Sequence, residues 1–280
     1  MRQNESLKVF RSPDLPGIEG VSGKYIHNHF RRHFHKTYVI GLVEQGMRKI
    51  TSDTGSTRIA EGEIFILNPG QVHACTSERN VGHTYKILCV PSEILQKIAS
   101  QISGTQVKGP CFNQILCKDK VLSEKFFHIF DIMENPGSDI RFKHTLISFF
   151  AYLIITFSAS SCSMGLPGDE KGIFKKACEY IKQNYSQNLS LQKIAESICL
   201  SPFHFHRVFK KKMGITPIEY LNDFRIRKSR KLLLYSHSMA DIALQMGFYD
   251  QSHFSRIFRK TVGVPPGRYR GTNRDESLTG

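Results

Sequence analysis

A stretch of about twenty residues occurs twice in this chain, about fifty residues apart. The first copy covers residues 199–220 and the second covers residues 247–269. An internal repeat constrains the architecture more than any single motif does, because one supersecondary unit must then be built twice. The aligned positions that share one offset are Phe205/Phe254, Arg207/Arg256, Phe209/Phe258, Lys210/Arg259, Gly214/Gly263, Pro217/Pro266 and Tyr220/Tyr269.

Each copy reads as two short helices across a tight turn. Ser190 and Ser238 stand directly before stretches with helical apolar spacing, where a serine caps a helix. Pro217 opens a longer helix between the two copies, since proline is favoured in the first helical turn. The sequence therefore predicts helix-turn-helix units over about 191–213 and 239–261, joined by one long helix.

The positive charge of the chain is concentrated in its C-terminal part. The formal net charge is +15, and residues 171–280 contain 20 Lys and Arg against 8 Asp and Glu, a balance of +12. A basic domain joined to a nearly neutral one is typical of a protein that binds a polyanion. We therefore expect nucleic acid to be the partner of the C-terminal part.

The N-terminal half has a different pattern. Residues 37–90 form short alternating segments separated by Gly and Pro, which is typical of a small barrel or sandwich, and helical spacing follows from Pro91. The expected fold class is α+β: a β-barrel with appended helices, followed by an all-α domain. The expected organisation is residues 1–160 as the first domain, 161–172 as a linker, 173–272 as the DNA-binding domain and 273–280 as a tail.

Several classes of protein are disfavoured. The seven cysteines are scattered, with no CxxC pair, so neither a zinc site nor a disulfide framework is indicated, and a reducing cytoplasm fits. The N-terminus lacks the apolar core of a secretory signal, and the apolar stretch 145–157 is shorter than a membrane span. We expect a cytoplasmic location without membrane contact.

The second helix of each helix-turn-helix unit is the candidate for reading DNA, and we call it the recognition helix. Its outward residues can contact DNA in the major groove, with Arg suited to guanine, Gln to adenine and Lys to phosphate. The alternative is a solvated basic face without a ligand. Residues expected to point outward are His204, His206, Arg207, Lys210 and Lys211 in the first copy, and Gln251, Ser252, Ser255, Arg256 and Lys260 in the second.

These residues and their spacing resemble the DNA-binding domain of the AraC/XylS family of bacterial transcription regulators. The resemblance rests on Gly214-x-x-Pro-x-x-Tyr220 and its copy Gly263-x-x-Pro-x-x-Tyr269, with the arginines and aromatics of both copies. It implies a ligand-responsive activator whose partners are promoter DNA, RNA polymerase and a small-molecule effector, with a homodimer as an option. Phe203 stands where the family often contacts bases, yet we expect it to pack rather than to meet a thymine methyl.

The N-terminal part resembles the family's cupin-like effector domain, chiefly in the segment Gly62–His73. This implies an effector pocket, for which His33, His35, Tyr38 and His73 are the candidate lining residues. His33 and His35 would share one face of a strand, and His73 could complete three imidazoles around a divalent ion. Cupin enzymes carry a Glu shortly after such a pair, which this chain lacks, so we expect a pocket without metal or cofactor.

The alternative from another functional class is an enzyme. A cupin metal-dependent oxygenase or lyase could be positioned on DNA by the basic domain. The missing Glu disfavours this reading, because a catalytic metal site needs its full set of protein ligands. We therefore expect a regulator without catalytic residues.

Overall fold

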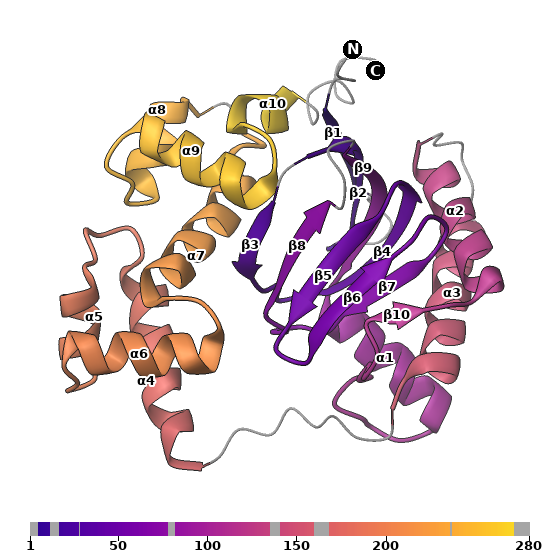
Figure 1. Cartoon of the computed structure of the whole chain (residues 1–280), viewed down its shortest axis with the longest axis horizontal. Helices are drawn as coiled ribbons and strands as arrows, with labels where there is room; N and C mark the ends of the chain where they lie inside the picture. Colours follow the sequence, from indigo (N-terminus) through magenta and orange to yellow (C-terminus); the bar gives the residue numbers. More distant parts are fainter. Residues whose placement is uncertain are drawn as a thin grey trace. The chain divides into compact units, whose positions relative to one another are not determined.

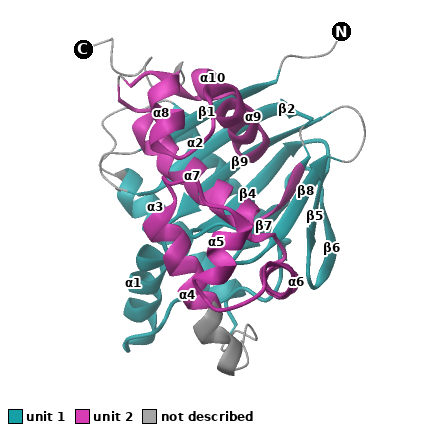
Figure 2. Cartoon of the chain, turned by 90° about the vertical axis from the view of Figure 1, so that its left-hand side faces the viewer, with its two compact units in different colours: residues 1–29, 34–163 teal, residues 30–33, 164–280 magenta. Residues whose placement is uncertain are grey.

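The computed structural model describes residues 5–11, 17–27, 29–77, 82–134, 141–159, 168–235 and 237–271 of the 280-residue chain. The chain forms two compact units, residues 1–29 with 34–163 and residues 30–33 with 164–280 (Figure 2). Among the described helices, none is both long and apolar enough to cross a membrane.

The described strands form two antiparallel sheets (Figure 1). The six-stranded sheet has the order β1 (Ser6–Arg11), β2 (Glu19–Ile26), β9 (His83–Val90), β4 (Tyr38–Gln45), β7 (Ile64–Leu67) and β10 (Leu116–Cys117). The four-stranded sheet has the order β3 (Phe30–His33), β8 (His73–Ser77), β5 (Arg48–Ser52) and β6 (Gly55–Ile59). The predicted barrel is thus built as two sheets, and the expectation of an α+β, cupin-like fold is confirmed.

Three helices follow the strands: α1 (Ser92–Ser103), α2 (Lys120–Glu134) and α3 (Arg141–Phe157). They lie along one side of the six-stranded sheet (Figure 1). The core between them includes Ile40 and Leu42 of β4, packed with Phe126 and Phe149 of the helices. Since side chains alternate along a strand, the other face of β4 is left for the interior between the sheets.

The second unit is helical. Its elements are α4 (Gly168–Asn184), α5 (Leu191–Glu196), α6 (Pro202–Met213), α7 (Pro217–Leu232), α8 (Met239–Gln245), α9 (Gln251–Val262) and α10 (Pro266–Gly271). The long helix α7 lies between the α5–α6 pair and the α8–α9 pair (Figure 1). This is the predicted order of two helix-turn-helix units and a joining helix.

Some boundaries and elements differ from the sequence-based prediction. Helix α4 begins at Gly168, inside the segment 161–172 expected to be a linker, and the first part of that segment lies outside the described residues. Strands β1, β2, β8 and β10 and helix α10 were not predicted. Cys111 is disulfide-bonded, which the scattered spacing did not suggest, whereas Cys75, Cys89, Cys117, Cys178 and Cys199 remain thiols.

Candidate nucleic-acid interface and effector site

The first helix-turn-helix is fixed by caps at both helices. The Ser190 hydroxyl accepts a hydrogen bond from the Lys193 amide at 3.2 Å, at the start of α5. The Ser201 hydroxyl accepts one from the His204 amide at 3.3 Å, at the start of α6. Gly214 ends α6 in the left-handed region with φ of 66°, which glycine adopts without a steric cost. Local sequence thus determines where the recognition helix begins and ends.

The second helix-turn-helix has the same kinds of cap as the first. The Ser238 hydroxyl accepts from the Asp241 amide at 3.0 Å before α8, and the Asp250 carboxylate accepts from the His253 amide at 2.6 Å before α9. Gly263 ends α9 with φ of 98°. Because the caps occupy equivalent positions, both recognition helices start and stop in the same way.

The aromatic cores of the two helix-turn-helix copies are also equivalent. Phe205 lies 5.3 Å from Phe209 between ring centroids, and Phe209 lies 5.8 Å from Tyr220. The matching distances in the second copy are 5.5 Å from Phe254 to Phe258 and 5.4 Å from Phe258 to Tyr269. Each chain of three rings runs from the recognition helix to the helix that follows it. The repeat in the sequence is therefore a repeat in packing, which orients α6 and α9 alike within their units.

This packing leaves the predicted DNA-contacting side chains on the outside. In α6, His206 is half-buried while His204, Arg207, Lys210 and Lys211 are exposed. In α9, Ser255 is half-buried while Gln251, Ser252, Arg256 and Lys260 are exposed. The last turn of α6 is basic, as is that of α9, which holds Arg259 and Lys260. Each helix thus presents a polar and basic face.

One expectation for this face is wrong. Phe203 is 78 % exposed rather than packed, because it lies at the start of α6 on a side that the core residue Phe205 does not share. Lys212 extends over the ring of Phe174, with its ammonium 4.7 Å from the centroid, so it differs from Lys210 and Lys211 beside it. Packing of the alkyl stem and a cation–π contact explain its place.

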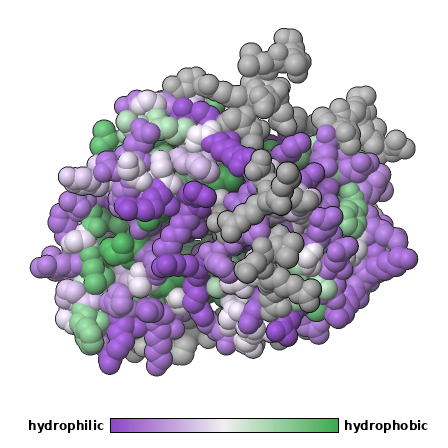
Figure 3. Space-filling view, turned by 45° about the horizontal axis from the view of Figure 1, so that its top comes forward, coloured by the Kyte–Doolittle hydropathy of each residue, from purple (hydrophilic) through white to green (hydrophobic). Residues whose placement is uncertain are grey.

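Two exposed apolar residues of the second helix-turn-helix were not predicted from the sequence. Tyr249, directly before the cap of α9, is 88 % exposed, and Leu244 of α8 is 63 % exposed. Apolar patches interrupt the mainly hydrophilic surface in Figure 3. The exposure of Tyr249 could have been predicted, because it lies outside the apolar spacing that buries Phe248 and Phe254.

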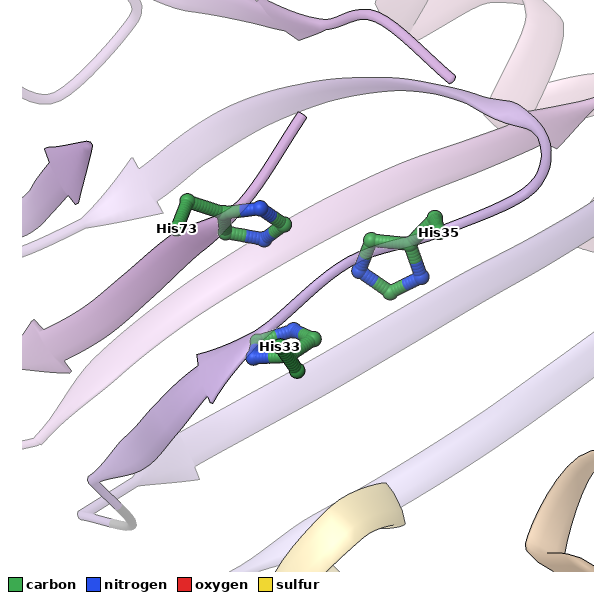
Figure 4. A group of neighbouring side chains, drawn as sticks. All are labelled: His33, His35 and His73. Atoms are coloured by element: carbon green, nitrogen blue, oxygen red, sulfur yellow. The ribbon is translucent and has the colours of Figure 1, made fainter. Parts of the chain in front are cut away.

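Three of the four candidate effector residues come together. His33 ends β3, His35 follows it, and His73 begins β8, the strand hydrogen-bonded to β3. Potential ligand nitrogens of the three rings all lie within 4.8 Å of one another (Figure 4). The rings of His35 and His73 are stacked with centroids 5.2 Å apart. His35 reaches the group from beyond the end of the strand, not from the strand itself as expected.

Tyr38 does not join this group. It lies on the face of β4 that packs against the helices, where its hydroxyl donates to the carbonyl of Pro110 at 2.6 Å and its ring meets Phe112 edge-on. Burial raises the pKa of Tyr38 to about 12. Alternation along β4 accounts for the error, because Tyr38 shares its face with Ile40 and Leu42.

A buried arginine was missed. Arg48 is 5 % exposed, and its guanidinium lies 4.7 Å from the ring centroid of Tyr85 and 5.1 Å from that of Phe65, on strands of the other sheet. Burial lowers the pKa of Arg48, but Cys75 and Tyr85, which accept its hydrogen bonds, raise it to a net increase. The signal was its alternation with the inward-facing Ile50. A cation is thus held between the sheets.

His83 lies beside this cation. Its Nε2 is 3.5 Å from a guanidinium nitrogen of Arg48, and its ring stacks on Tyr85 with centroids 5.1 Å apart. Burial lowers the pKa of His83, and together with the charges of Arg48 and His27 it brings the value to about 3. The imidazole is therefore neutral at physiological pH. The interior holds a polar group of Arg48, Tyr85, His83 and Cys75.

Comparisons with known proteins match both units. Residues 15–150 match the model of an AraC-like ligand binding domain, and residues 194–272 match that of a helix-turn-helix domain. The HTH-type transcriptional regulator YbfI of Bacillus subtilis is 31% identical over 254 residues, covering 89% of this chain and 90% of its own length. The lactose operon transcription activator of Staphylococcus xylosus is 30% identical, covering 76% of each chain.

Further likenesses agree with these. The transcriptional activator RhaS of Klebsiella pneumoniae is 27% identical, covering 80% of this chain and 81% of its own. Among solved structures, apo ToxT K231A of Vibrio cholerae aligns with a TM-score of 0.58 at 16% identity, covering 96% of both chains, which supports the fold. The chain, with both of its domains, therefore belongs to the AraC/XylS family of transcription regulators, which are DNA-binding, ligand-responsive proteins rather than enzymes.

Proposed function

We propose that the chain is a transcriptional activator that reads promoter DNA at two successive major-groove segments, one through α6 and one through α9. The observation that carries this proposal is that both helix-turn-helix copies have the same caps, the same aromatic packing and an exposed basic face. Helix α7 is 16 residues long, which at 1.5 Å per residue spans about 24 Å between them. Activation is supported by the names of the related RhaS and lactose operon activators.

The side chains divide into two proposed roles. Arg207, Arg256 and Gln251 are suited to base edges, because Arg pairs with guanine and Gln with adenine. Lysines act as point charges on phosphates, so Lys210, Lys211 and Lys260 would hold the register without reading sequence. The remaining proposed contacts are Phe203, His204, His206, Ser252 and Ser255, with the exposed ring of Phe203 now available for a thymine methyl.

Selection of binding sites from random DNA tests this proposal. The full chain should enrich a bipartite motif, with two conserved blocks whose centres lie about one helical turn, 10 to 10.5 base pairs, apart. At physiological salt it should bind the motif at least about a thousandfold more tightly than random DNA. Enrichment of one block alone, or of none, would contradict a bipartite reader.

We further infer that a small-molecule effector enters between the sheets of the N-terminal unit and contacts Arg48 and the group His33, His35 and His73. A buried guanidinium favours an anionic or oxygen-rich effector, since Arg binds carboxylates in a bidentate geometry. The effector regulates only if it binds the active arrangement more tightly than the inactive one, because equal affinities shift nothing.

A thermal-shift screen of sugars, amino acids and aromatic acids tests the effector site. A ligand of the native state raises the unfolding midpoint by mass action. We expect a hit whose shift is lost in Arg48→Met and kept in Lys49→Met, a half-buried neighbour on the same strand. A hit with equal shifts in both variants would place the effector elsewhere.

Self-association, contact with RNA polymerase and a cytoplasmic location complete the proposal. Helices α2 and α3 expose apolar side chains that a second copy could cover, namely Val121, Phe127, Ile147 and Ile155. Activation at a promoter requires the polymerase as a partner, and promoter DNA places the protein in the bacterial cytoplasm.

A further inference from the structure

In place of the metal-free pocket that the missing Glu predicted, we propose that His33, His35 and His73 bind one divalent transition-metal ion such as Zn²⁺. Among the residues that the structure describes, these three form the one group of His, Cys, Asp and Glu side chains whose potential ligand atoms meet so closely. Figure 4 shows their rings gathered around one space between β3 and β8. Imidazole suits Zn²⁺, Cu²⁺, Ni²⁺ and Fe²⁺ rather than Mg²⁺ or Ca²⁺.

Two backbone hydrogen bonds prepare the rings for a metal. The Nδ1 atom of His33 lies 2.6 Å from the carbonyl oxygen of Arg31, and that of His73 lies 2.9 Å from the carbonyl oxygen of Gln71. A carbonyl only accepts, so each Nδ1 must carry the proton, and in the neutral ring Nε2 then has the lone pair. Metal-binding histidines are oriented in this way by outer-shell carbonyls.

The required movement is small. Tetrahedral ligands at about 2.0–2.1 Å from Zn²⁺ have nitrogens about 3.4 Å apart, whereas the three nitrogens here lie within 4.8 Å. His33 and His35 are half-buried at or beyond a strand end, so their side chains can rotate, while His73 is 1 % exposed and anchored on β8. Closing these distances by at most about 1.4 Å would bring the nitrogens to tetrahedral spacing, and rotation of the His33 and His35 side chains can contribute to it.

Three imidazoles leave one position of a tetrahedral ion for water or another donor. Sites with three protein ligands keep such a position open, whereas sites with four protein ligands do not. The neutral imidazoles leave the ion its full positive charge, which favours an anionic donor at that position. The site would thus take a divalent ion together with an exchangeable anion or oxygen donor.

Titration of the untagged full chain with Co²⁺ tests this site directly and does not depend on DNA binding. We expect one Co²⁺ per chain, an intense tetrahedral absorption spectrum without a thiolate band, displacement by Zn²⁺, and a spectral change on adding azide. His33→Gln and His35→Gln should each weaken Co²⁺ binding by at least about tenfold. His128→Gln, at an exposed position on α2, should bind as the parent chain does.

The two half-buried positions decide the outcome even if the buried His73 tolerates no change. Absence of stoichiometric Co²⁺ binding, or equal affinities of His33→Gln, His35→Gln and His128→Gln, would overturn the proposal. A Co²⁺ spectrum that does not respond to azide would overturn the open coordination position. Loss of DNA binding with Co²⁺ binding intact would instead contradict the proposed function and leave the metal site standing.

Discussion

Arg256 and Lys211 are both exposed on recognition helices, yet different effects are expected when each is shortened to alanine. Arg256→Ala should weaken binding to the selected motif by about 1 to 3 kcal/mol and relax preference at one base pair, because bidentate contact with guanine is lost. Lys211→Ala should weaken all sequences similarly and reduce the slope of log affinity against log salt by about one. Fluorescence anisotropy on motif and random DNA at several salt concentrations measures both. Equal losses on both DNAs for Arg256→Ala would remove its role in base readout.

His83 gives the first unit a specific pH dependence. Its pKa of about 3 in the folded chain lies below the ordinary value of 6.5, so the unfolded chain takes up the proton first as the pH falls. Its contribution to stability is complete above pH 6.5 and is lost progressively towards pH 3. At 1.36 kcal/mol per pKa unit, the parent should lose about 2 kcal/mol between pH 6.5 and 5 through this group.

The measurement is urea unfolding at pH 7 and pH 5 for the parent, His83→Phe and His128→Gln. The loss of unfolding free energy on acidification should be about 2 kcal/mol smaller in His83→Phe, whose ring can still stack on Tyr85. His128→Gln, at an exposed position, controls for removing a histidine as such. The same loss in all three proteins would show that His83 does not titrate as described.

The exposure of a side chain could be predicted where the residues that surround it are close to it in the sequence. Arg207 and Arg256 could be placed outward because the helical period and the repeat fix their direction. Phe203 could not, since its exposure depends on what packs near the start of α6. Arg48 was not predicted to be buried, because cations are rarely buried. Its guanidinium lies over the rings of Tyr85 and Phe65 on the other sheet, contacts that the sequence does not indicate.

Gly247 lies in the turn of the second helix-turn-helix, where the backbone and its neighbours require glycine. It has φ of 77°, and a Cβ there would lie 2.7 Å from a guanidinium nitrogen of Arg225 and 2.8 Å from the backbone of Ser186. Gly247→Ala should therefore destabilise the C-terminal unit by about 1 to 3 kcal/mol. Thermal unfolding with DNA affinity measures the effect.

Gly267 provides the matched control. A Cβ at this position of α10 would meet nothing within 4 Å, and its φ is not positive. Gly267→Ala should leave stability unchanged or raise it by up to about 1 kcal/mol, because alanine favours a helix over glycine. A similar destabilisation by both substitutions would mean that the turn at Gly247 is not what requires glycine.

Elements with strong local signals were predicted well and the others were not. The helix-turn-helix units begin at capping residues, and their observed bounds agree with the predicted 191–213 and 239–261 to within one residue at each end. Strand β2 was missed because it contains Gly20 and Gly23, and a Cβ on Gly23 would fall 2.7 Å from the ring of Tyr85. Its identity comes from pairing with β1 and β9, which the alternation of its own residues does not reveal.

At the scale of the whole molecule, the apolar surface of α2 and α3 predicts self-association. Ile155 is 69 % exposed on α3, and Phe127 is 39 % exposed on α2. Ile155→Glu should shift the protein from dimer towards monomer, because a buried unpaired carboxylate costs several kcal/mol. Sedimentation equilibrium compares it with Lys143→Glu, an exposed position on the same helix. A parent chain that is monomeric at all concentrations would contradict the proposed dimer.

If the two helix-turn-helix copies read DNA together, single substitutions in each copy should affect different base pairs of the bound motif. Each base pair of the selected motif is replaced in turn, and affinities are measured for the parent, Arg207→Ala and Arg256→Ala. We expect the two variants to lose preference at different positions, about 10 base pairs apart, each with the other block intact. Loss at the same position in both variants, or a uniform loss with no lost preference, would contradict a bipartite reader.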